Sequence, residues 1–146
     1  MSLELRIATP SDVETLFEIR TSVTQNHLSR EQMAELGITA EVLASILETE
    51  PCAWIAHQDG VAVGFAMVDG EAGEVFALFI RPGHEGLGVG RGLMALAEGY
   101  LFQHHERIWL VTDGHADIRA NGFYQRLGWE QVGRVDERDV RYEKGR

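Results

Sequence analysis

The chain has 146 residues and a formal net charge of −10 at pH 7, and its only cysteine is Cys52. This length is that of one domain, so we expect residues 1–146 to form a single domain. A lone cysteine excludes an internal disulfide, which is typical of proteins in a reducing compartment. The acidic charge argues against a nucleic-acid partner, which would require a concentrated basic surface.

The longest mostly apolar runs are residues 61–68 and 75–80. Both are far shorter than the roughly 20 residues that cross a bilayer, and both have the length of a buried strand. The first residues lack a basic segment followed by an apolar run, so no signal peptide is expected. These features predict a cytoplasmic protein with no membrane partner.

The first elements along the chain are predicted to be a strand and a helix. Residues 3–7 alternate apolar and polar side chains, which is typical of a half-buried strand. Thr9 can cap the helix that follows, Pro10 suits its first position, and Asp12 completes a capping box. The residues that share one mostly apolar stripe of this helix are Val13, Leu16, Phe17 and Arg20.

A second helical region is predicted before the next strands. It begins near Ser29, breaks at Gly37 and restarts at Thr39. After the restart, four apolar residues fall on one helix face: Val42, Leu43, Ile46 and Leu47.

The apolar period then changes from 3.6 residues to about two, which indicates strands. Residues 53–57 and 61–68 are joined by Asp59-Gly60 and are predicted to form a hairpin. A second turn at residues 69–73 leads into a strand at residues 74–80.

The rest of the chain alternates helices and strands. A Gly-rich loop at residues 83–92 opens a helix, and a buried strand is predicted at 108–112. A helix at 117–127 is stopped by Gly128. The residues expected to face inward from the first of these helices are Leu93, Leu96, Ala97, Tyr100 and Leu101.

A closing hairpin of residues 129–133 and 140–143 completes the predicted order, which is β-α-α-β-β-β-α-β-α-β-β. This order predicts an α/β fold, in which a mixed sheet has helices on its faces. The strand–loop–helix–strand unit at residues 74–112 is the parallel crossover of that sheet.

The most informative segment runs Glu85-Gly86-Leu87-Gly88-Val89-Gly90-Arg91-Gly92, between a strand and a helix. Glycines let the backbone approach a ligand closely, and a helix N-terminus presents unpaired N–H groups and the positive end of the helix dipole. The segment therefore predicts an anion site suited to phosphates.

Two other phosphate-binding motifs are partly similar to this loop. A P-loop ends in Gly-Lys-Ser/Thr, whereas this loop ends in Gly90-Arg91-Gly92, so that motif is excluded. A dinucleotide fold requires an acidic residue about twenty positions on, which Asp113 provides. Its glycine spacing differs, however, and residues 81–85 separate the strand from the glycines. A nucleotide-cofactor oxidoreductase is therefore kept as an alternative.

These segments together resemble the GNAT superfamily, the acetyl-CoA-dependent N-acetyltransferases. Residues 74–82 are similar to the fourth strand of that family, and residues 85–90 to its pyrophosphate loop, usually Gln/Arg-x-x-Gly-x-Gly/Ala. Residues 120–129 resemble its later helix motif. The chain departs from the family pattern at Glu85, where Gln or Arg is usual, and at Asp117, where Asn is usual.

The resemblance implies a mostly antiparallel sheet whose fourth and fifth strands splay apart. It also implies transfer of an acetyl group from acetyl-CoA to a primary amine, by direct attack in a ternary complex. The pantetheine arm would bond to the backbone of Leu78, Phe79 and Ile80, and an N–H near Leu78 would polarise the thioester carbonyl. The pyrophosphate would bind at Glu85, Gly86, Leu87, Gly88, Val89, Gly90 and Arg91.

The candidate catalytic and acceptor residues each have a second interpretation. Glu74 is a candidate general base, acting directly or through water, or else a solvated carboxylate at a strand end. By resemblance, Tyr124 would protonate the departing thiolate; the alternative is an ordinary core residue. Arg20, Asn26 and His27 are candidates to face the acceptor, although a polar helix end would also explain them.

No metal site is predicted. The amine acceptor, whether a small molecule or a protein amine, is not identified by the sequence, and a homodimer is left open. A non-catalytic acyl-CoA-binding module is a further alternative, since it would have the same loop without turnover.

Overall fold

The structure is a computed structural model, and it describes residues 2–23, 28–86, 88–114 and 119–146. The strands are β1 (Leu3–Ile7), β2 (Ala53–Gln58), β3 (Val61–Asp69), β4 (Glu74–Ile80), β5 (Arg107–Asp113), β6 (Glu130–Arg134) and β7 (Asp139–Gly145). The helices are α1 (Val13–Ser22), α2 (Arg30–Glu35), α3 (Ala40–Thr49), α4 (Val89–Leu101) and α5 (Arg119–Arg126), and a 3-10 turn at Pro10–Asp12 precedes α1.

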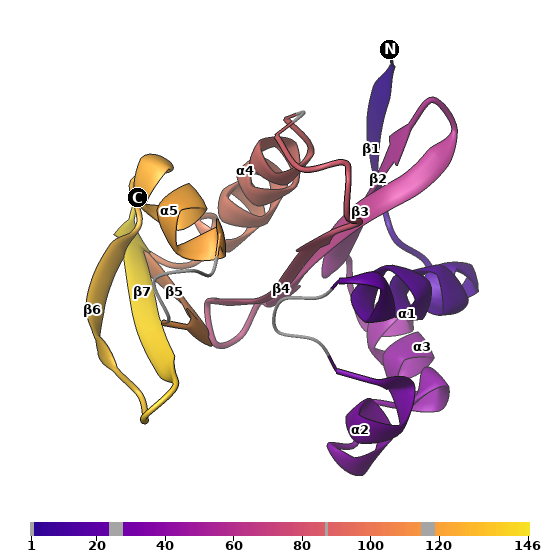
Figure 1. Cartoon of the computed structure of the whole chain (residues 1–146), viewed down its shortest axis with the longest axis horizontal. Helices are drawn as coiled ribbons and strands as arrows, with labels where there is room; N and C mark the ends of the chain where they lie inside the picture. The colour runs from indigo at the N-terminus through magenta and orange to yellow at the C-terminus, as the bar shows by residue number, and fades with distance from the viewer. Residues whose placement is uncertain (1, 24–27, 87, 115–118) are drawn as a thin grey trace.

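The strands form one sheet in the order β1-β2-β3-β4-β5-β7-β6 (Figure 1). Neighbouring strands are antiparallel except β4 and β5, which are parallel. The predicted α/β class, the mostly antiparallel sheet and the parallel crossover through α4 are therefore confirmed. The second helical region forms two helices, α2 and α3, because the chain turns at Gly37 with a φ of +85°.

Strand β4 has different relations with its two neighbours. Along β3 it pairs from Asp69 opposite Glu74 to Gly64 opposite Ile80, with an irregularity that leaves Phe76 without a partner. Along β5, the paired position within the described residues is Glu74 opposite Trp109. The two strands therefore meet at the start of β4 and diverge toward its end, as the predicted splay requires.

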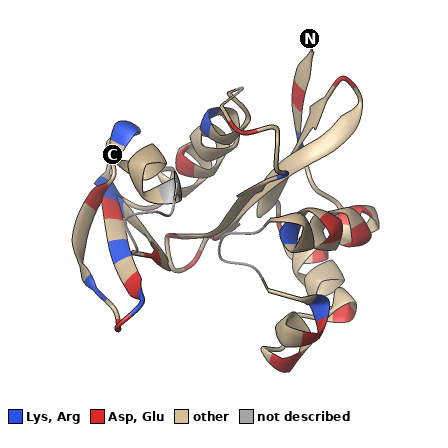
Figure 2. Cartoon of the chain, in the orientation of Figure 1, with Lys and Arg blue, Asp and Glu red and all other residues tan. Residues whose placement is uncertain are grey.

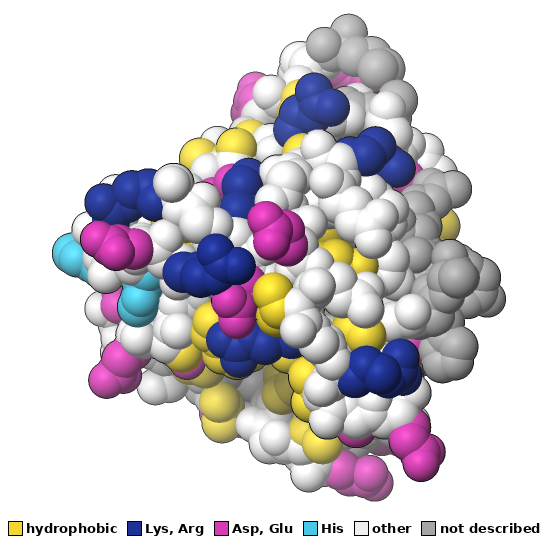
Figure 3. Space-filling model, turned by 90° about the vertical axis from the view of Figure 1, so that its left-hand side faces the viewer, with side chains coloured by type: hydrophobic (Ala, Val, Ile, Leu, Met, Phe, Trp, Pro, Cys, Tyr) yellow, Lys and Arg dark blue, Asp and Glu magenta, His cyan; other side chains and the backbone are white. Residues whose placement is uncertain are grey.

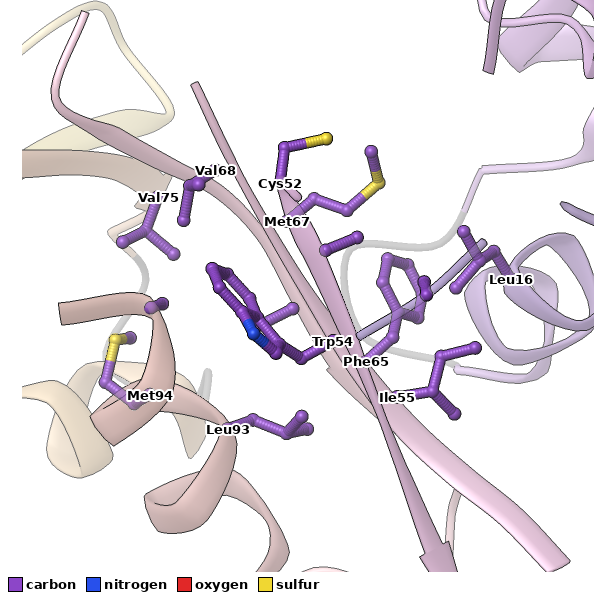
Figure 4. Close-up of a cluster of buried hydrophobic side chains, with 14 of the residues drawn as sticks. Leu16, Cys52, Trp54, Ile55, Phe65, Met67, Val68, Val75, Leu93 and Met94 are labelled. Carbon is purple, nitrogen blue, oxygen red and sulfur yellow. The ribbon is translucent and has the colours of Figure 1, made fainter. Parts of the chain in front are cut away.

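Helices cover both faces of the sheet (Figure 1). Leu93 and Met94 of α4 lie on one side beside Trp54, while Leu16 of α1 lies on the other side beside Phe65 (Figure 4). These side chains are all buried. The core therefore has two layers of packing, separated by the central strands β2 and β3.

Some residues of the predicted apolar faces are exposed. Leu43 and Leu47 of α3 are buried, but Val42 and Ile46 are 47% and 40% exposed, because only part of the stripe reaches the sheet. In α4 Met94 is buried, whereas Leu96 was wrongly predicted to face inward and is 37% exposed.

The edge strand β1 is also less buried than its alternation predicted. Leu3 and Ile7 are exposed, and Leu5, which is half-buried, lies against Gly92 of α4. A Cβ added at Gly92 would stand 2.9 Å from Leu5 Cδ1, so the glycine allows this approach. Among the described residues, no helix is long and apolar enough to cross a membrane.

The start of α1 is fixed by a buried carboxylate. Asp12 accepts two hydrogen bonds from the Arg6 guanidinium, at 2.7 and 2.8 Å, and a third from the Thr9 N–H at 2.8 Å. The Arg6 side chain and the Thr9 amide lower the pKa of Asp12 to about 2. The predicted role of Asp12 at this helix start is thus accompanied by an ion pair to β1.

Replacing Asp12 by Asn is expected to destabilise the protein in a pH-dependent manner. Since the folded-state pKa of Asp12 is depressed to about 2, the charged carboxylate stabilises the fold above its unfolded pKa of about 3.9. Because Arg6 is half exposed, the loss at neutral pH should be about 1–2 kcal/mol rather than the full shift. This difference should disappear as the pH falls from about 4 to about 2.

Urea denaturation of the wild-type protein and the Asp12→Asn variant across this pH range measures the effect. Glu14→Gln, which removes the exposed partner of Arg30, is the control and should change stability less. A loss of stability that is equal at every pH would contradict the electrostatic origin.

Candidate active site

The predicted Gly-rich loop joins the end of β4 to the start of α4. Gly86 and Gly88 have φ values of +78° and +85°, which side chains disfavour, and Gly88 is the residue that precedes the helix. The first helical hydrogen bond after it runs from the Gly92 N–H to the Gly88 carbonyl, at 3.0 Å. The N–H groups of Val89, Gly90 and Arg91 belong to the first turn, where a helix leaves its donors available for an anion.

The last two glycines of the loop serve packing. A Cβ at Gly90 would stand 3.1 Å from the Phe123 ring, so this glycine lets α5 lie against the N-terminal end of α4. Gly92 does the same for Leu5 of β1. The glycine pattern therefore has two causes, backbone conformation at Gly86 and Gly88 and close approach at Gly90 and Gly92.

The Glu85 carboxylate is bound within the loop itself. Its two oxygens accept the Gly83 N–H at distances of 3.2 and 3.3 Å. This bond gives the side chain that departs from the family pattern a structural role in the turn that precedes Gly86.

The second half of β4 has an open backbone edge. Ala66, Phe65 and Gly64 of β3 are opposite Leu78, Phe79 and Ile80, respectively. On the other side, the β5 partner lies back at Glu74, so in the described structure residues 78–80 have no ladder partner toward β5. An unpaired edge of this kind can accept hydrogen bonds from another extended chain of amides.

The side chains of this segment point to opposite faces of the sheet. Ile80 Cδ1 lies near Gly64 on the α4 side, where Leu93 is also close. Phe79 faces the α1 side, where its ring lies 5.8 Å from that of Phe65 and beneath the guanidinium of Arg20. The predicted acceptor residue Arg20 therefore lies beside the strand segment whose backbone is predicted to bind the pantetheine arm. Its contact with that segment is to the Phe79 side chain.

Glu74 is half-buried at the position where β4 meets β5. Its burial raises the pKa of the carboxyl, the nearby Asp69 raises it further, and Arg141 opposes both. A carboxylate with a raised pKa binds a proton more readily, which suits a general base.

Tyr124 is buried in an aromatic cluster. Its ring centroid lies 5.6 Å from those of Phe123 and Tyr142 and 6.4 Å from that of Trp129. Burial, with a smaller contribution from Tyr142, raises the pKa of the Tyr124 hydroxyl. The hydroxyl therefore stays protonated at neutral pH, and its neighbour Phe123 connects it to the loop at Gly90.

Asn121 is a residue whose role the sequence did not predict. Its Nδ2 donates to the Asp113 carbonyl at the end of β5, and its Oδ1 accepts the Tyr142 hydroxyl of β7, both at 2.9 Å. It thus connects the helix of Tyr124 to two strands. The available signal was a polar residue one turn before Tyr124, on the same helix.

The remaining predicted site residues are placed as follows. The Val89 side chain is buried, so Val89 can contribute only its backbone N–H to a ligand. Arg91 is exposed. Leu87, Asn26 and His27 lie outside the described residues. In the part of the chain that is described, no group of three or more His, Cys, Asp or Glu side chains could hold a metal ion.

Comparison with known proteins shows that most of the chain is similar to acetyltransferases. Residues 13–129 match the model of the acetyltransferase (GNAT) family. An uncharacterised N-acetyltransferase of Archaeoglobus fulgidus is 32% identical over 79 residues, which is 48% of this chain and 54% of that protein. The alignment thus spans about half the length of that relative.

Solved structures match the whole fold. The PaiA N-acetyltransferase of Thermoplasma acidophilum, in complex with coenzyme A, has a TM-score of 0.81 at 19% identity, with all of both chains covered. YncA of Salmonella typhimurium, a putative acetyltransferase with its cofactor acetyl-CoA, has a TM-score of 0.75 at 15% identity, covering 99% of this chain and 94% of the other. The family match over residues 13–129, on this sheet and this glycine loop, shows that the chain belongs to the GNAT family of acetyltransferases.

Proposed function

We propose that the protein transfers an acetyl group from acetyl-CoA to a primary amine, by direct attack within a ternary complex. The observation that carries this function is the open edge of β4 at residues 78–80, next to the N-terminal turn of α4. The edge supplies hydrogen-bonding groups for an extended amide-containing arm, and the helix turn supplies N–H groups for its pyrophosphate. Family membership and neighbours solved with coenzyme A or acetyl-CoA support this proposal.

The backbone near Leu78 has the role of an oxyanion hole. Acetyl-CoA supplies an acetyl thioester when it is bound. An N–H of the open edge donates to the carbonyl oxygen of this thioester, which gains negative charge as the amine nitrogen bonds to the carbonyl carbon. The pyrophosphate is bound at Glu85–Arg91 mainly by backbone amides, since the Glu85 carboxylate is bonded to Gly83.

Glu74 accepts the proton that the amine loses. It precedes Leu78 by four positions on the strand, a distance of about 13 Å at 3.3 Å per residue. This separation is too long for direct contact with an amine at the thioester, or for a single bridging water, so the proton passes to Glu74 along a chain of several waters.

Tyr124 donates a proton to the sulfur when the carbon–sulfur bond breaks, which releases coenzyme A as a thiol and leaves the acetylated amine. Burial raises the pKa of the Tyr124 hydroxyl and keeps it protonated at neutral pH, so it has a proton to donate to the leaving group. The acceptor is a small-molecule or protein amine, and we propose a cytoplasmic enzyme that requires no metal.

A thiol-release assay with acetyl-CoA and a broad panel of primary amines tests this function, together with calorimetry of acetyl-CoA and NAD. Amine-dependent thiol release is the expected result. Acetyl-CoA binding without turnover on any amine would instead indicate a non-catalytic acyl-CoA-binding module. Binding of NAD without acetyl-CoA would indicate an oxidoreductase, although the mostly antiparallel sheet differs from the parallel sheet of dinucleotide folds.

Gly88→Ala is expected to weaken acetyl-CoA binding roughly tenfold, because a left-handed residue other than glycine costs about 1–2 kcal/mol and the loop relaxes away from the anion. Gly37→Ala is the matched control, since Gly37 has the same φ of +85° and the same open surroundings. It should lose similar stability while binding acetyl-CoA normally. Calorimetry and thermal unfolding of both variants measure the two effects.

Glu85→Gln should bind acetyl-CoA as well as the wild type or better. Glutamine retains an oxygen that can accept the Gly83 N–H, while a charge that repels the pyrophosphate is removed. A tenfold loss of acetyl-CoA affinity in calorimetry would contradict the assignment of binding to the backbone amides.

Glu74→Gln is expected to lower kcat/KM by about 10²–10⁴-fold and to change the acidic limb of its pH profile. The pKa of Glu74 is raised, so the limb due to its protonation should lie above the usual range of a glutamate. Glu71→Gln, which alters an exposed carboxylate on the adjoining turn, is the control and should leave the profile unchanged. An unaltered profile in Glu74→Gln would assign the proton to another group.

Tyr124→Phe is expected to fold and bind acetyl-CoA nearly normally, with kcat reduced by about 10²–10⁴-fold. Tyr142→Phe is the contrast, because it removes a buried hydroxyl that is bonded to Asn121 and should lose about 1–3 kcal/mol of stability. Steady-state kinetics and melting temperatures of both variants separate the roles. A fully active but destabilised Tyr124→Phe would show that Tyr124 is an ordinary core residue.

A further inference from the structure

Arg20 differs from most other arginines of the protein in how its guanidinium is paired. Arg6, Arg30 and Arg81 each form an ion pair, with Asp12, Glu14 and Glu18 respectively. On the face of β6 and β7, blue and magenta side chains intermingle (Figure 3), and Arg107 and Arg141 share Glu143. The Nη1 atom of Arg20, in contrast, is buried and has no hydrogen-bond partner among the residues that the structure describes.

This guanidinium is held in a defined place. Its central carbon lies 4.1 Å from the centroid of the Phe79 ring, a distance typical of a cation–π contact. Phe79 in turn packs against Phe65, which lies on the α1 side of the sheet (Figure 4). Arg20 is therefore fixed at the side of β4 opposite α4, over one of the residues whose backbone is proposed to bind the pantetheine arm.

The Arg20 side chain is half-buried, and a buried Nη1 without a hydrogen bond is costly. The same burial lowers the pKa of Arg20. A ligand anion would offset this cost, because charge-assisted bonds to guanidinium are among the stronger hydrogen bonds. The ring stack orients the plane of the guanidinium, and a planar carboxylate fits the N–H edge of such a group.

The charge of Arg20 also limits the acceptor. A primary amine has a pKa near 10.4 and arrives mostly as an ammonium, which Arg20 repels. Arg81 also lies on this side of β4, where it pairs with the largely exposed Glu18 at 3.5 Å, so its charge is partly compensated. An acceptor that also carries an anion would be attracted, and its amine would be oriented away from Arg20.

The face of β4 from which the acceptor can approach also agrees with a contact to Arg20. Helix α4 and its loop cover one face of β4, and the pantetheine arm would fill the edge toward β5 (Figure 1). The α1 side is then the face from which a second substrate reaches the thioester. Acidic residues prevail along α1 to α3 (Figure 2), so the positive charge of Arg20 stands among mostly acidic residues.

We propose that Arg20 binds a carboxylate of the acceptor, so that the substrates of this enzyme are amines that carry a carboxylate, such as amino acids. This inference rests on the proposed acetyl transfer to an amine. It assigns Arg20 a role in substrate specificity, with no part in binding acetyl-CoA.

The test compares ω-amino acids of increasing length with their carboxamides, in the wild type, Arg20→Met and Arg30→Met. Methionine keeps an apolar stem over the phenylalanine ring and removes the charge. Arg30 is a matched control, since it lies 4.2 Å from the Phe17 ring but already pairs with Glu14. Thermal unfolding of each variant verifies the fold.

The wild type and Arg30→Met should prefer the carboxylates. Arg20→Met should lose roughly 30-fold or more in kcat/KM for the carboxylates, with little change for the carboxamides and an unchanged KM for acetyl-CoA. An equal loss for both substrate series would make Arg20 a structural residue and overturn the inference.

Two further results also decide the matter. If the wild type acetylates amines without a preference for carboxylates, or prefers a phosphate-bearing amine, the specificity inference fails while acetyl transfer stands. If acetyl-CoA binds but no amine is acetylated, the proposed function fails, and the inference fails with it.

Discussion

The pairing of β4 with β5 at Glu74 and Trp109 is the constraint on which the candidate site depends. A parallel pair requires a long crossover, here α4, and this helix packs against β3 and β4 and also begins at the glycine loop. Since β5 pairs fully with β7 but diverges from β4, the edge of residues 78–80 is left open beside the N-terminal turn of α4. One topological feature therefore places the anion site and the unpaired edge together.

The position of Tyr124 depends on a second set of contacts. Asn121 connects α5 to the end of β5 and to Tyr142 of β7, while Phe123 packs on Gly90 at the start of α4. The same short helix is thus fixed to the sheet by hydrogen bonds and to the loop by close packing. A larger residue at position 90 would move α5, and with it Tyr124, without touching the phenol itself. Gly90 therefore couples the position of the cofactor loop to the position of Tyr124, the proposed acid.

Much of the fold was predictable because its signals are local. Period-two runs, the Asp59-Gly60 turn and the glycine loop each indicate their own element, and the structure contains all of them. Errors arose where tertiary contact decides burial: Leu96 is on the apolar side of α4 by periodicity, yet the sheet reaches Met94 instead. The network of Asn121 joins residues far apart in sequence, so spacing alone could not reveal it. Glu85 is similar, because its bond to Gly83 depends on how the turn folds.

Burial acts on three proposed site residues in the same direction, since removal from water disfavours the charged form of each. For Glu74 this raises the pKa and makes the carboxylate a better proton acceptor. For Tyr124 it keeps the hydroxyl protonated until charge develops on the sulfur. For Arg20, which stays charged, burial makes the free protein less stable and an anionic ligand correspondingly more favourable. Removal from water thus favours three different roles. It favours the protonated, neutral form of Glu74 and of Tyr124, whereas Arg20 stays charged and favours an anionic ligand.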